Sequence, residues 1–356
     1  MAADTNENST AKTANGRIAE HFVQLDGLRG FAIFFVVCCH CNLLVHGGGL
    51  ANAFFFDLAG FLLINPFKER SEERFLSLWG ILRFYGSRAL RILPGYYLVV
   101  LLVYFQSDGL WFTREQFFKL LCFNEIWGHF WYIYAYFWVT FFIPFIMLLF
   151  LLLAKKIKAL KNDLVCSLFF LVLAGGLRIL CIGLDVTDIR LDQLMVGIAA
   201  GYFCRYIRNN DKFKESIVKF KTAGDILILF IVLLVFILAS KKVLNLISPG
   251  LGDKSFGWDY LYISALLMGL LIILTFLFRE GISAKIFRIK PLVFIGKHSY
   301  LIYLLNFLVA LQIRPESEIL WFIGVFSVSI VLAYVVDSLL EFVISRCKMI
   351  KGFKKQ

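Results

Sequence analysis

Long apolar stretches recur through almost the whole chain, and each is close to the length that a helix needs to cross a bilayer. A membrane-spanning helix takes about 20 apolar residues. Of the 356 residues, 60% are hydrophobic and only 17% are charged, which is more apolar surface than a water-soluble core can bury. The pattern predicts an all-α integral membrane protein with about ten transmembrane helices, near residues 27–46, 51–66, 92–107, 130–154, 164–184, 190–208, 222–240, 258–278, 291–313 and 319–345.

Lysine and arginine alternate between the segments that join these stretches. Both ends of the chain and every second connecting segment together hold 27 of the 37 basic residues, whereas the intervening segments hold seven. Cytoplasmic loops of membrane proteins carry such an excess. The sequence therefore predicts that both termini are cytoplasmic, and adding or losing one span would destroy the alternation. The same topology accounts for the net charge of +12, so nucleic-acid binding is not expected.

The chain divides into one membrane domain with a polar segment at each end. Residues 1–24 lack an apolar core and are expected to form a disordered cytoplasmic tail, not a cleavable signal peptide. Residues 25–345 are the membrane domain, and residues 346–356 are a basic cytoplasmic tail. The eight cysteines include no CxxC pair, and Cys39, His40 and Cys41 point in different directions on a helix. Neither a metal site nor a disulfide framework is predicted.

The first apolar stretch contains two ionisable residues, Arg29 and His40. Ionisable groups within a bilayer are costly and usually face a polar interior. The two positions differ by 11 in the sequence, so on a helix they lie about 20° apart in azimuth and roughly 16 Å apart along the axis. Arg29, near the cytosolic end, can bind a phosphate, and His40, deeper in, can accept a proton near neutral pH. The alternative is that Arg29 only anchors the helix and His40 only packs.

Further polar residues are expected at the outer level of the membrane, at a depth similar to that of His40. They come from five other predicted helices and are Asp57, His129, Arg178, Arg190, Asp192 and Asn306. This common depth favours a polar cavity, and the alternative is internal pairing, such as Asp57 with Arg178. On the cytosolic side, Arg88 and Arg91 share one helix face just before Pro94, and Lys297 and His298 enter from the same side. The arginine pair could clamp a phosphorylated ligand, or it could serve only as a positive-inside anchor.

Six short motifs, in order along residues 25–345, resemble those of the membrane-bound acyltransferase-3 family. The first is Leu25-Asp26-Gly27-Leu28-Arg29-Gly30, followed by ten residues between Arg29 and His40. The others are the aromatic-rich stretch 53–62, the Arg88 and Arg91-Ile92-Leu93-Pro94 element, His129-Phe130-Trp131-Tyr132 with Pro144, Arg190 with Asp192 and Gly197, and Gly296-Lys297-His298-Ser299-Tyr300 with its continuation to Leu304. Three positions depart from the family pattern: Ala59 replaces a common Ser, Asn306 a common His, and Tyr134-Ala135-Tyr136 a region that often holds Glu.

The resemblance implies an O-acyltransferase that moves an acyl group, most often acetyl, from cytosolic acyl-CoA to a hydroxyl of a lipid-linked or surface glycan. No metal is implied, and the expected location is the plasma (inner) membrane. The residues implied in catalysis are His40, as the general base or the carrier of the acyl group, and Arg29. The residues implied in donor binding are Arg29, Arg88, Arg91 and Lys297. Those implied in binding the acceptor or in orienting groups are Asp57, His129, Trp131, Arg190, Asp192, Ser299, Tyr300 and Asn306.

Two other functions fit some of the same features. Intramembrane histidine and arginine also suit a proton-coupled transporter or flippase of a glycan or small solute, although no inverted repeat is evident. A non-catalytic sensor or scaffold would fit the departures at Ala59 and Asn306. The sequence gives no prediction of oligomeric state.

Overall fold

The computed structural model describes residues 11–12, 18–19, 22–68, 70–106, 113–186, 189–254 and 261–353. Within them the chain is helical, apart from one antiparallel pair of short strands, β1 (Ala11–Lys12) and β2 (Ile18–Ala19). The longer helices are α1 (Val23–His40), α2 (Gly47–Ile64), α3 (Leu78–Gln106), α5 (Trp131–Lys156), α6 (Asp163–Gly183), α7 (Leu191–Arg208), α9 (Lys221–Ala239), α11 (Leu261–Leu277), α14 (Ser299–Gln312) and α15 (Glu318–Phe353). The shorter ones are η1 (Ser71–Leu76), α4 (Arg114–Leu121), η2 (Gly128–Phe130), η3 (Lys158–Lys161), α8 (Asp211–Lys219), α10 (Lys241–Ile247), η4 (Leu251–Asp253), α12 (Ile282–Ile286) and α13 (Lys290–Lys297).

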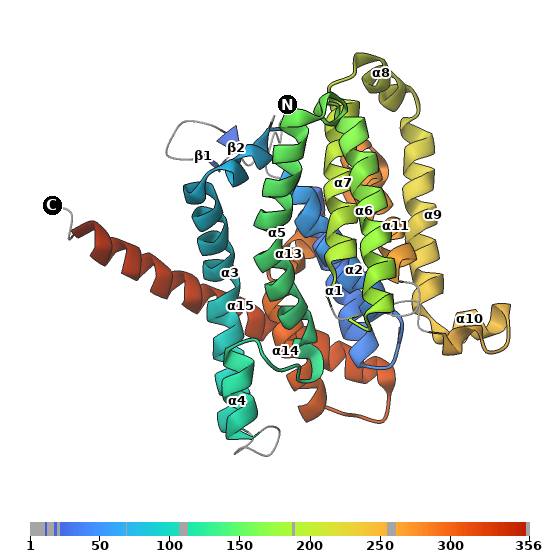
Figure 1. The fold of residues 1–356 in the computed structure, drawn as a ribbon. Coiled ribbons are helices and arrows are strands. Elements are labelled where there is room, and N and C mark those ends of the chain that lie inside the picture. The colour runs from blue at the N-terminus through green and yellow to red at the C-terminus, as the bar shows by residue number, and fades with distance from the viewer. Residues whose placement is uncertain are drawn as a thin grey trace, which may run out of the picture.

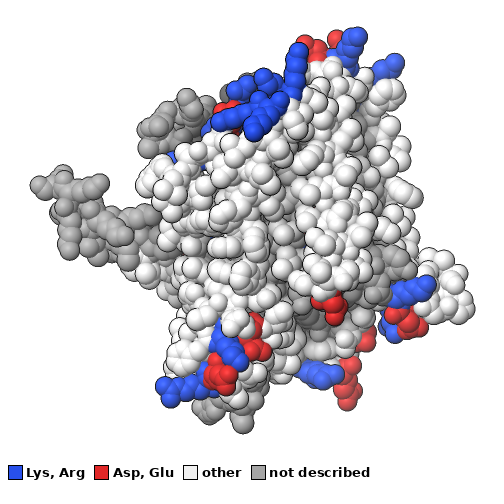
Figure 2. Space-filling model, in the orientation of Figure 1, with Lys and Arg blue, Asp and Glu red and all other residues white. Residues whose placement is uncertain are grey.

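The helices form one bundle with α1 and α2 at its centre. Helix α2 contacts α1, α7 and α11, and 78% of its apolar window is buried, against 22% for α6 and α15. Figure 1 shows that the axes of α3, α5, α6, α7 and α9 are roughly parallel, whereas α15 crosses to the C-terminus at an angle. The peripheral helices present exposed apolar residues outward. Figure 2 shows the result as a broad uncharged band, with lysine and arginine gathered mainly at one end of the molecule. These surfaces fit a lipid environment.

Seven helices in the described part of the chain are long and apolar enough to cross a membrane, or eight when α13 and α14 count as one bent span. The other two expected spans correspond to α7, which contains the charged residues Asp192, Arg205 and Arg208, and to α11, which is shorter. The all-helical membrane fold is therefore confirmed. The total of ten spans, the side on which the termini lie and the domain limits stay predictions. Most of the predicted tail 1–24 and residues 354–356 lie outside the described residues.

Three details of the helices differ from the prediction. Helix α1 ends at His40, and Gly47, Gly48 and Gly49 form the first turn of α2 and not a loop. The turn packs closely on α1, since a Cβ atom at Gly48 would lie 3.0 Å from Cys39 Sγ. Helix α3 begins at Leu78, well before the expected start, and continues through Pro94. The expected span 291–313 is broken at His298, where α13 and α14 meet at 77°.

Close backbone contact between α2 and α7 sets the position of Asp57. A Cβ atom at Gly197 would lie 1.9 Å from the carbonyl oxygen of Asp57, and one at Gly60 would lie 2.2 Å from that of Leu194. Only glycine allows the two backbones to approach this closely. Asp57 and the start of α7 are therefore held against each other inside the bundle.

Candidate functional site

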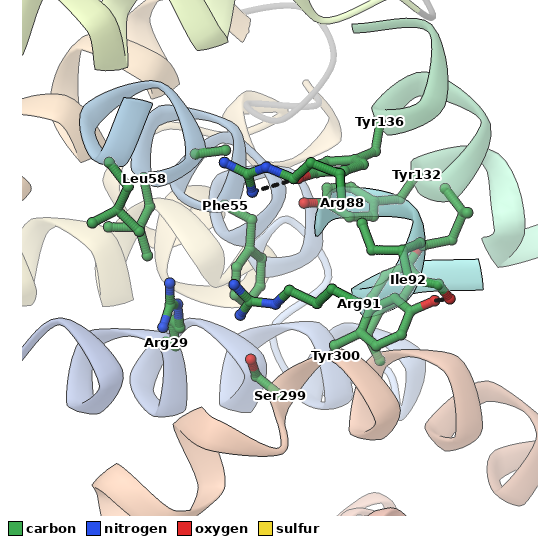
Figure 3. Close-up of a pocket in the computed structure, with 14 residues that line it drawn as sticks. Arg29, Phe55, Leu58, Arg88, Arg91, Ile92, Tyr132, Tyr136, Ser299 and Tyr300 are labelled. Carbon is green, nitrogen blue, oxygen red and sulfur yellow. Dashed lines mark hydrogen bonds between the residues drawn. The ribbon is translucent and has the colours of Figure 1, made fainter. Parts of the chain in front are cut away.

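A pocket of about 90 Å³ inside the bundle is lined by three arginines, and we call it the arginine pocket. Arg29 comes from α1, whereas Arg88 and Arg91 come from α3. Figure 3 shows the three side chains reaching into a common space. The remaining lining residues are mostly apolar or aromatic: Phe55, Leu58, Ala59, Leu62, Ile92, Tyr132, Ile133, Tyr136, Ser299, Tyr300 and Tyr303. The structure thus brings together three of the four residues predicted to bind the donor.

The arginine pocket carries a net positive charge. No acidic side chain is among its lining residues in the described part of the chain. Arg29 Nη1 pairs with Asp26 Oδ1 at 2.5 Å, and Arg88 Nη1 donates a hydrogen bond to the Tyr136 hydroxyl at 2.8 Å. One nearby carboxylate therefore faces three guanidinium groups. Arginine binds the oxygens of phosphates and carboxylates with several directed hydrogen bonds, so the pocket suits an anionic ligand.

Positive charge continues from α3 to the neighbouring turn η1. Two guanidinium carbons lie near the ring of Phe84, that of Arg74 at 6.0 Å from the ring centroid and that of Arg88 at 5.5 Å. Arg74 Nη2 also donates to the Leu63 carbonyl at 3.0 Å. Burial lowers the pKa of Arg74 from its ordinary value, and the charge of Arg88 lowers it further. The fold thus holds two like charges close to one aromatic ring.

The bend at His298 directs the start of α14 into the arginine pocket. Ser299 and Tyr300 form the first turn of α14, and both line the pocket. The Tyr300 hydroxyl donates to the Ile92 carbonyl at 2.7 Å, which ties α14 to α3. Backbone N–H groups in the first turn of a helix favour anions. Ser299 and Tyr300, assigned by resemblance to the acceptor or to orientation, therefore lie beside the arginines.

His40 lies at the end of α1 and is held by Asn306 of α14. Its Nδ1 is hydrogen-bonded to the side-chain oxygen of Asn306. The amide nitrogen of Asn306 donates to the carbonyls of Ile302 and Tyr303, at 2.9 and 2.8 Å, so its oxygen must face His40. His40 therefore donates from Nδ1, which leaves the lone pair of the neutral ring on Nε2. Such a nitrogen can accept a proton from a hydroxyl.

His129 lies next to His40, and together with Asn306 they make what we call the histidine cluster. The two imidazole centroids are 6.4 Å apart. His129 Nε2 is 3.0 Å from the Leu304 carbonyl, so this nitrogen carries the proton. Tyr303 joins the cluster to the arginine pocket, because it lines the pocket while its hydroxyl donates to the His129 carbonyl. The predicted donor and acceptor regions are thus adjacent.

The other predicted outer residues form a separate charged group between α2, α6 and α7. All four residues of this group are buried: Asp57, Arg178, Arg190 and Asp192. The charges of both arginines act on the carboxylate of Asp192. The Arg190 guanidinium lies 5.3 Å from the centroid of Trp131. The suggested Asp57–Arg178 pair is not formed among the described residues, because neither carboxylate oxygen of Asp57 meets a donor at hydrogen-bond distance. One predicted polar group is therefore two: the histidine cluster and this charged group.

Lys297 is not part of the arginine pocket. It is the last residue of α13 and is exposed, because the bend carries α14 inward and leaves the end of α13 on the surface. The part of Lys297 in donor binding therefore stays a prediction, and it is not supported by a place in this pocket. The next residue, His298, pairs through Nδ1 with Asp337 Oδ2 of α15 at 2.8 Å.

A family model described as an acyltransferase domain, that of the acyltransferase-3 family, matches residues 22–338. The chain belongs to the acyltransferase-3 family. The match covers every element from α1 to most of α15, including the arginine pocket and the histidine cluster. No curated protein and no solved structure gives a significant match. The protein is therefore a membrane-embedded acyltransferase.

In this acyltransferase-3 member, four aromatic walls of the site were not predicted: Phe55, Tyr132, Tyr136 and Tyr303. The spacing of Tyr132 and Tyr136 by four residues places both on one face of α5 and was the available signal. Tyr136, in the region where other members often carry Glu, accepts the Arg88 hydrogen bond. Asn306, at the position of a common His, orients His40.

Proposed function

We propose that the protein transfers an acyl group, most simply acetyl, from cytosolic acyl-CoA to a hydroxyl of a lipid-linked or surface glycan at the plasma membrane. The observation that carries this proposal is the adjacency of a pocket with three arginines and a histidine held with one nitrogen ready to take a proton. The pocket supplies charge for a phosphorylated donor, and the histidine supplies a base for a hydroxyl.

In the proposed reaction, the arginine pocket holds phosphate oxygens of the donor, and the flexible arm of CoA carries the thioester toward His40. His40 Nε2 accepts the proton of the acceptor hydroxyl as its oxygen forms a bond to the thioester carbonyl carbon. The carbon–sulfur bond then breaks, and His40 returns the proton to the departing CoA thiolate. Asn306 keeps the imidazole in one tautomer and stabilises its charged form during the reaction.

The reaction is tested with the purified full-length chain and acetyl-CoA labelled in the acetyl group. For the wild type we expect transfer of the label to an added glycan. Without a glycan, we expect hydrolysis of acetyl-CoA, with water as the acceptor. His40→Ala is expected to reduce turnover by about 100-fold or more, because general-base catalysis contributes about 10²–10⁴-fold. His46→Gln, a change of a histidine that bonds to the Gly252 carbonyl outside the cluster, serves as control.

Two results would contradict the catalytic role of His40: normal turnover in His40→Ala, or an equal loss in the control. Movement of a glycan across a vesicle membrane without consumption of any acyl-CoA would instead identify a transporter. Protein abundance and thermal unfolding are measured for each variant so that a folding defect is recognised.

Donor binding is tested on two arginines of the same helix. Arg91→Gln removes a charge from the arginine pocket and is expected to raise the KM for acetyl-CoA by about 10–100-fold, because a hydrogen bond to a charged group is worth about 1.5–3 kcal/mol. Arg83→Gln removes an exposed charge of α3 outside the pocket and should leave the KM within about twofold. Equal shifts in the two variants would show that only overall charge matters.

A further inference from the structure

A second cavity, of about 180 Å³, lies between α3 and α5, and we call it the α3–α5 crevice. It shares four lining residues with the arginine pocket: Arg88, Ile92, Ile133 and Tyr136. Its other lining residues are Tyr85, Ala89, Leu93, Phe123, Phe137, Thr140 and Phe141. The crevice therefore begins where the arginine pocket ends, with Arg88 at the boundary.

The walls of the crevice present hydrocarbon to any occupant. The Tyr85 hydroxyl donates to the Phe141 carbonyl at 2.7 Å, and the Tyr136 hydroxyl accepts from Arg88, so both phenols already have partners. Phe123 and Phe137 stack in parallel, with centroids 4.3 Å apart. A dry apolar cavity of about 150 Å³ can hold a benzene molecule. The crevice thus has room for several carbons of a chain, and its walls are apolar or aromatic apart from Arg88 at the boundary and Thr140.

The surroundings of the crevice indicate how a chain would reach it. Phe141, which lines it, is 42% exposed, and Leu90, next to the lining residue Ala89, is 64% exposed. Only 28% of the apolar window of α3 is buried, and 33% of that of α5. In a membrane this surface faces the acyl chains of lipids. A hydrocarbon chain can therefore pass sideways from the bilayer into the crevice without meeting water.

We propose that the α3–α5 crevice holds the hydrocarbon chain of a lipid-linked acceptor whose phosphate lies against Arg88. The inference rests on the proposed acyl transfer and assigns its acceptor to lipid phosphates. A phosphate joined directly to an alkyl chain needs a cation and an apolar surface in contact, and Arg88 belongs to both cavities. In acyl-CoA a long polar arm separates the phosphates from the acyl group. The donor therefore does not match a site in which a cation directly adjoins an apolar surface. Arg29 and Arg91 remain for the donor.

The test uses the full-length chain in nanodiscs of phosphatidylcholine and two photoreactive probes. One is dodecyl phosphate with a diazirine near the end of its chain, and the other is dodecanol with the same group. The phosphate probe is expected to label the segments 85–93 and 133–141, and unlabelled dodecyl phosphate should displace it. The alcohol probe should label the crevice at least about tenfold less, because it lacks the charged contact with Arg88.

Two adjacent substitutions on α3 provide the matched variants. Ala89→Trp places an indole in the crevice and is expected to reduce labelling about tenfold, which corresponds to the exclusion of about two methylene groups. Leu90→Trp adds the same ring on the exposed surface and should leave labelling unchanged.

Three results would overturn the proposal: equal labelling of the crevice by both probes, an equal effect of the two tryptophans, or displacement by a long-chain acyl-CoA but not by dodecyl phosphate. Consumption of acetyl-CoA is measured on the same samples. Turnover without crevice labelling overturns the lipid site and leaves the proposed function standing. Crevice labelling without turnover supports the lipid site while the proposed function fails.

Discussion

At the scale of single residues, Asn306 determines which ring nitrogen of His40 carries the proton. An amide can present either its oxygen or its nitrogen to an imidazole, and the two backbone carbonyls that bind the nitrogen leave only the oxygen. His40 is thereby held as the tautomer with its proton on Nδ1. A histidine at position 306 could donate or accept, so asparagine removes an ambiguity. The departure from the common family residue is thus consistent with an active enzyme.

The orienting role of Asn306 predicts a loss of turnover with little change in donor binding. Asn306→Ala should lower kcat by about 10–100-fold, the usual cost of removing a group that orients a catalytic residue, while the KM for acetyl-CoA stays within about threefold. Asn306→Asp keeps an acceptor oxygen toward His40 and should retain most of the rate. Steady-state kinetics of the three proteins check this. Equal losses in Ala and Asp variants would refute the role of the hydrogen bond.

At the scale of helices, the bend between α13 and α14 assembles the site. It turns Ser299 and Tyr300 toward Arg29, Arg88 and Arg91 while Lys297 stays on the surface. His298 lies at the bend, with its ring 4.7 Å from that of Phe294 and its Nδ1 bonded to Asp337 of α15. The pair fastens the bend to a neighbouring helix, so it acts on the pocket by positioning α14.

Loss of the His298–Asp337 hydrogen bond is expected to weaken donor binding. Asp337→Leu removes the partner of His298 and should raise the KM for acetyl-CoA by about tenfold with kcat nearly unchanged, because a hydrogen bond to a charged group contributes about 1.5–3 kcal/mol. Asp337→Asn retains an acceptor and should restore most of the affinity. Glu341→Leu, at an exposed position one turn further along α15, is the control. A fall in kcat alone would place the effect elsewhere.

The sequence predicts the helices better than their joints. Apolar runs located nearly every long helix. The arginines at 29, 88 and 91, which the sequence singled out, line one pocket, and their part in donor binding stays a prediction. The bend at His298 was missed because hydropathy alone predicts one continuous span over 291–313, although Gly296 and Ser299 flank the bend. The extension of α3 back to Leu78 was missed because Arg83, Arg88 and Arg91 read as a loop of basic residues. Tertiary contacts decide both features, and a hydropathy pattern does not contain them.

At the scale of the whole molecule, the surface charge seen in Figure 2 lies at the two ends of an apolar body. Figure 2 shows lysine and arginine concentrated mainly at one end, and α8 lies at this end in Figure 1, whereas α4 lies at the opposite end. An unequal distribution of basic residues orients a membrane protein with its richer side in the cytoplasm. The orientation stays a prediction from these charges, which the structure gathers mainly at one end of the molecule.

This orientation predicts opposite labelling of two introduced cysteines. Lys212→Cys in α8 should react with a membrane-impermeant thiol reagent only after the cells are permeabilised, whereas Glu115→Cys in α4 should react in intact cells. The unsubstituted protein gives the background from its own cysteines. Labelling of both positions from the same side would require an even number of spans between them, whereas the predicted topology has three, α5, α6 and α7, and would contradict that topology.

The pairing of Arg29 with Asp26 has a consequence for the end of the catalytic cycle. An anion that enters the arginine pocket competes with a carboxylate already bound to one of the three guanidinium groups. Part of the attraction is therefore cancelled from within, equally for the incoming thioester and for spent CoA. If the pocket bound acyl-CoA and CoA equally tightly, release of the product would slow and the chemical step would be no faster. In the proposed reaction, this internal competitor favours rapid exchange of one nucleotide thiol for the next acylated one.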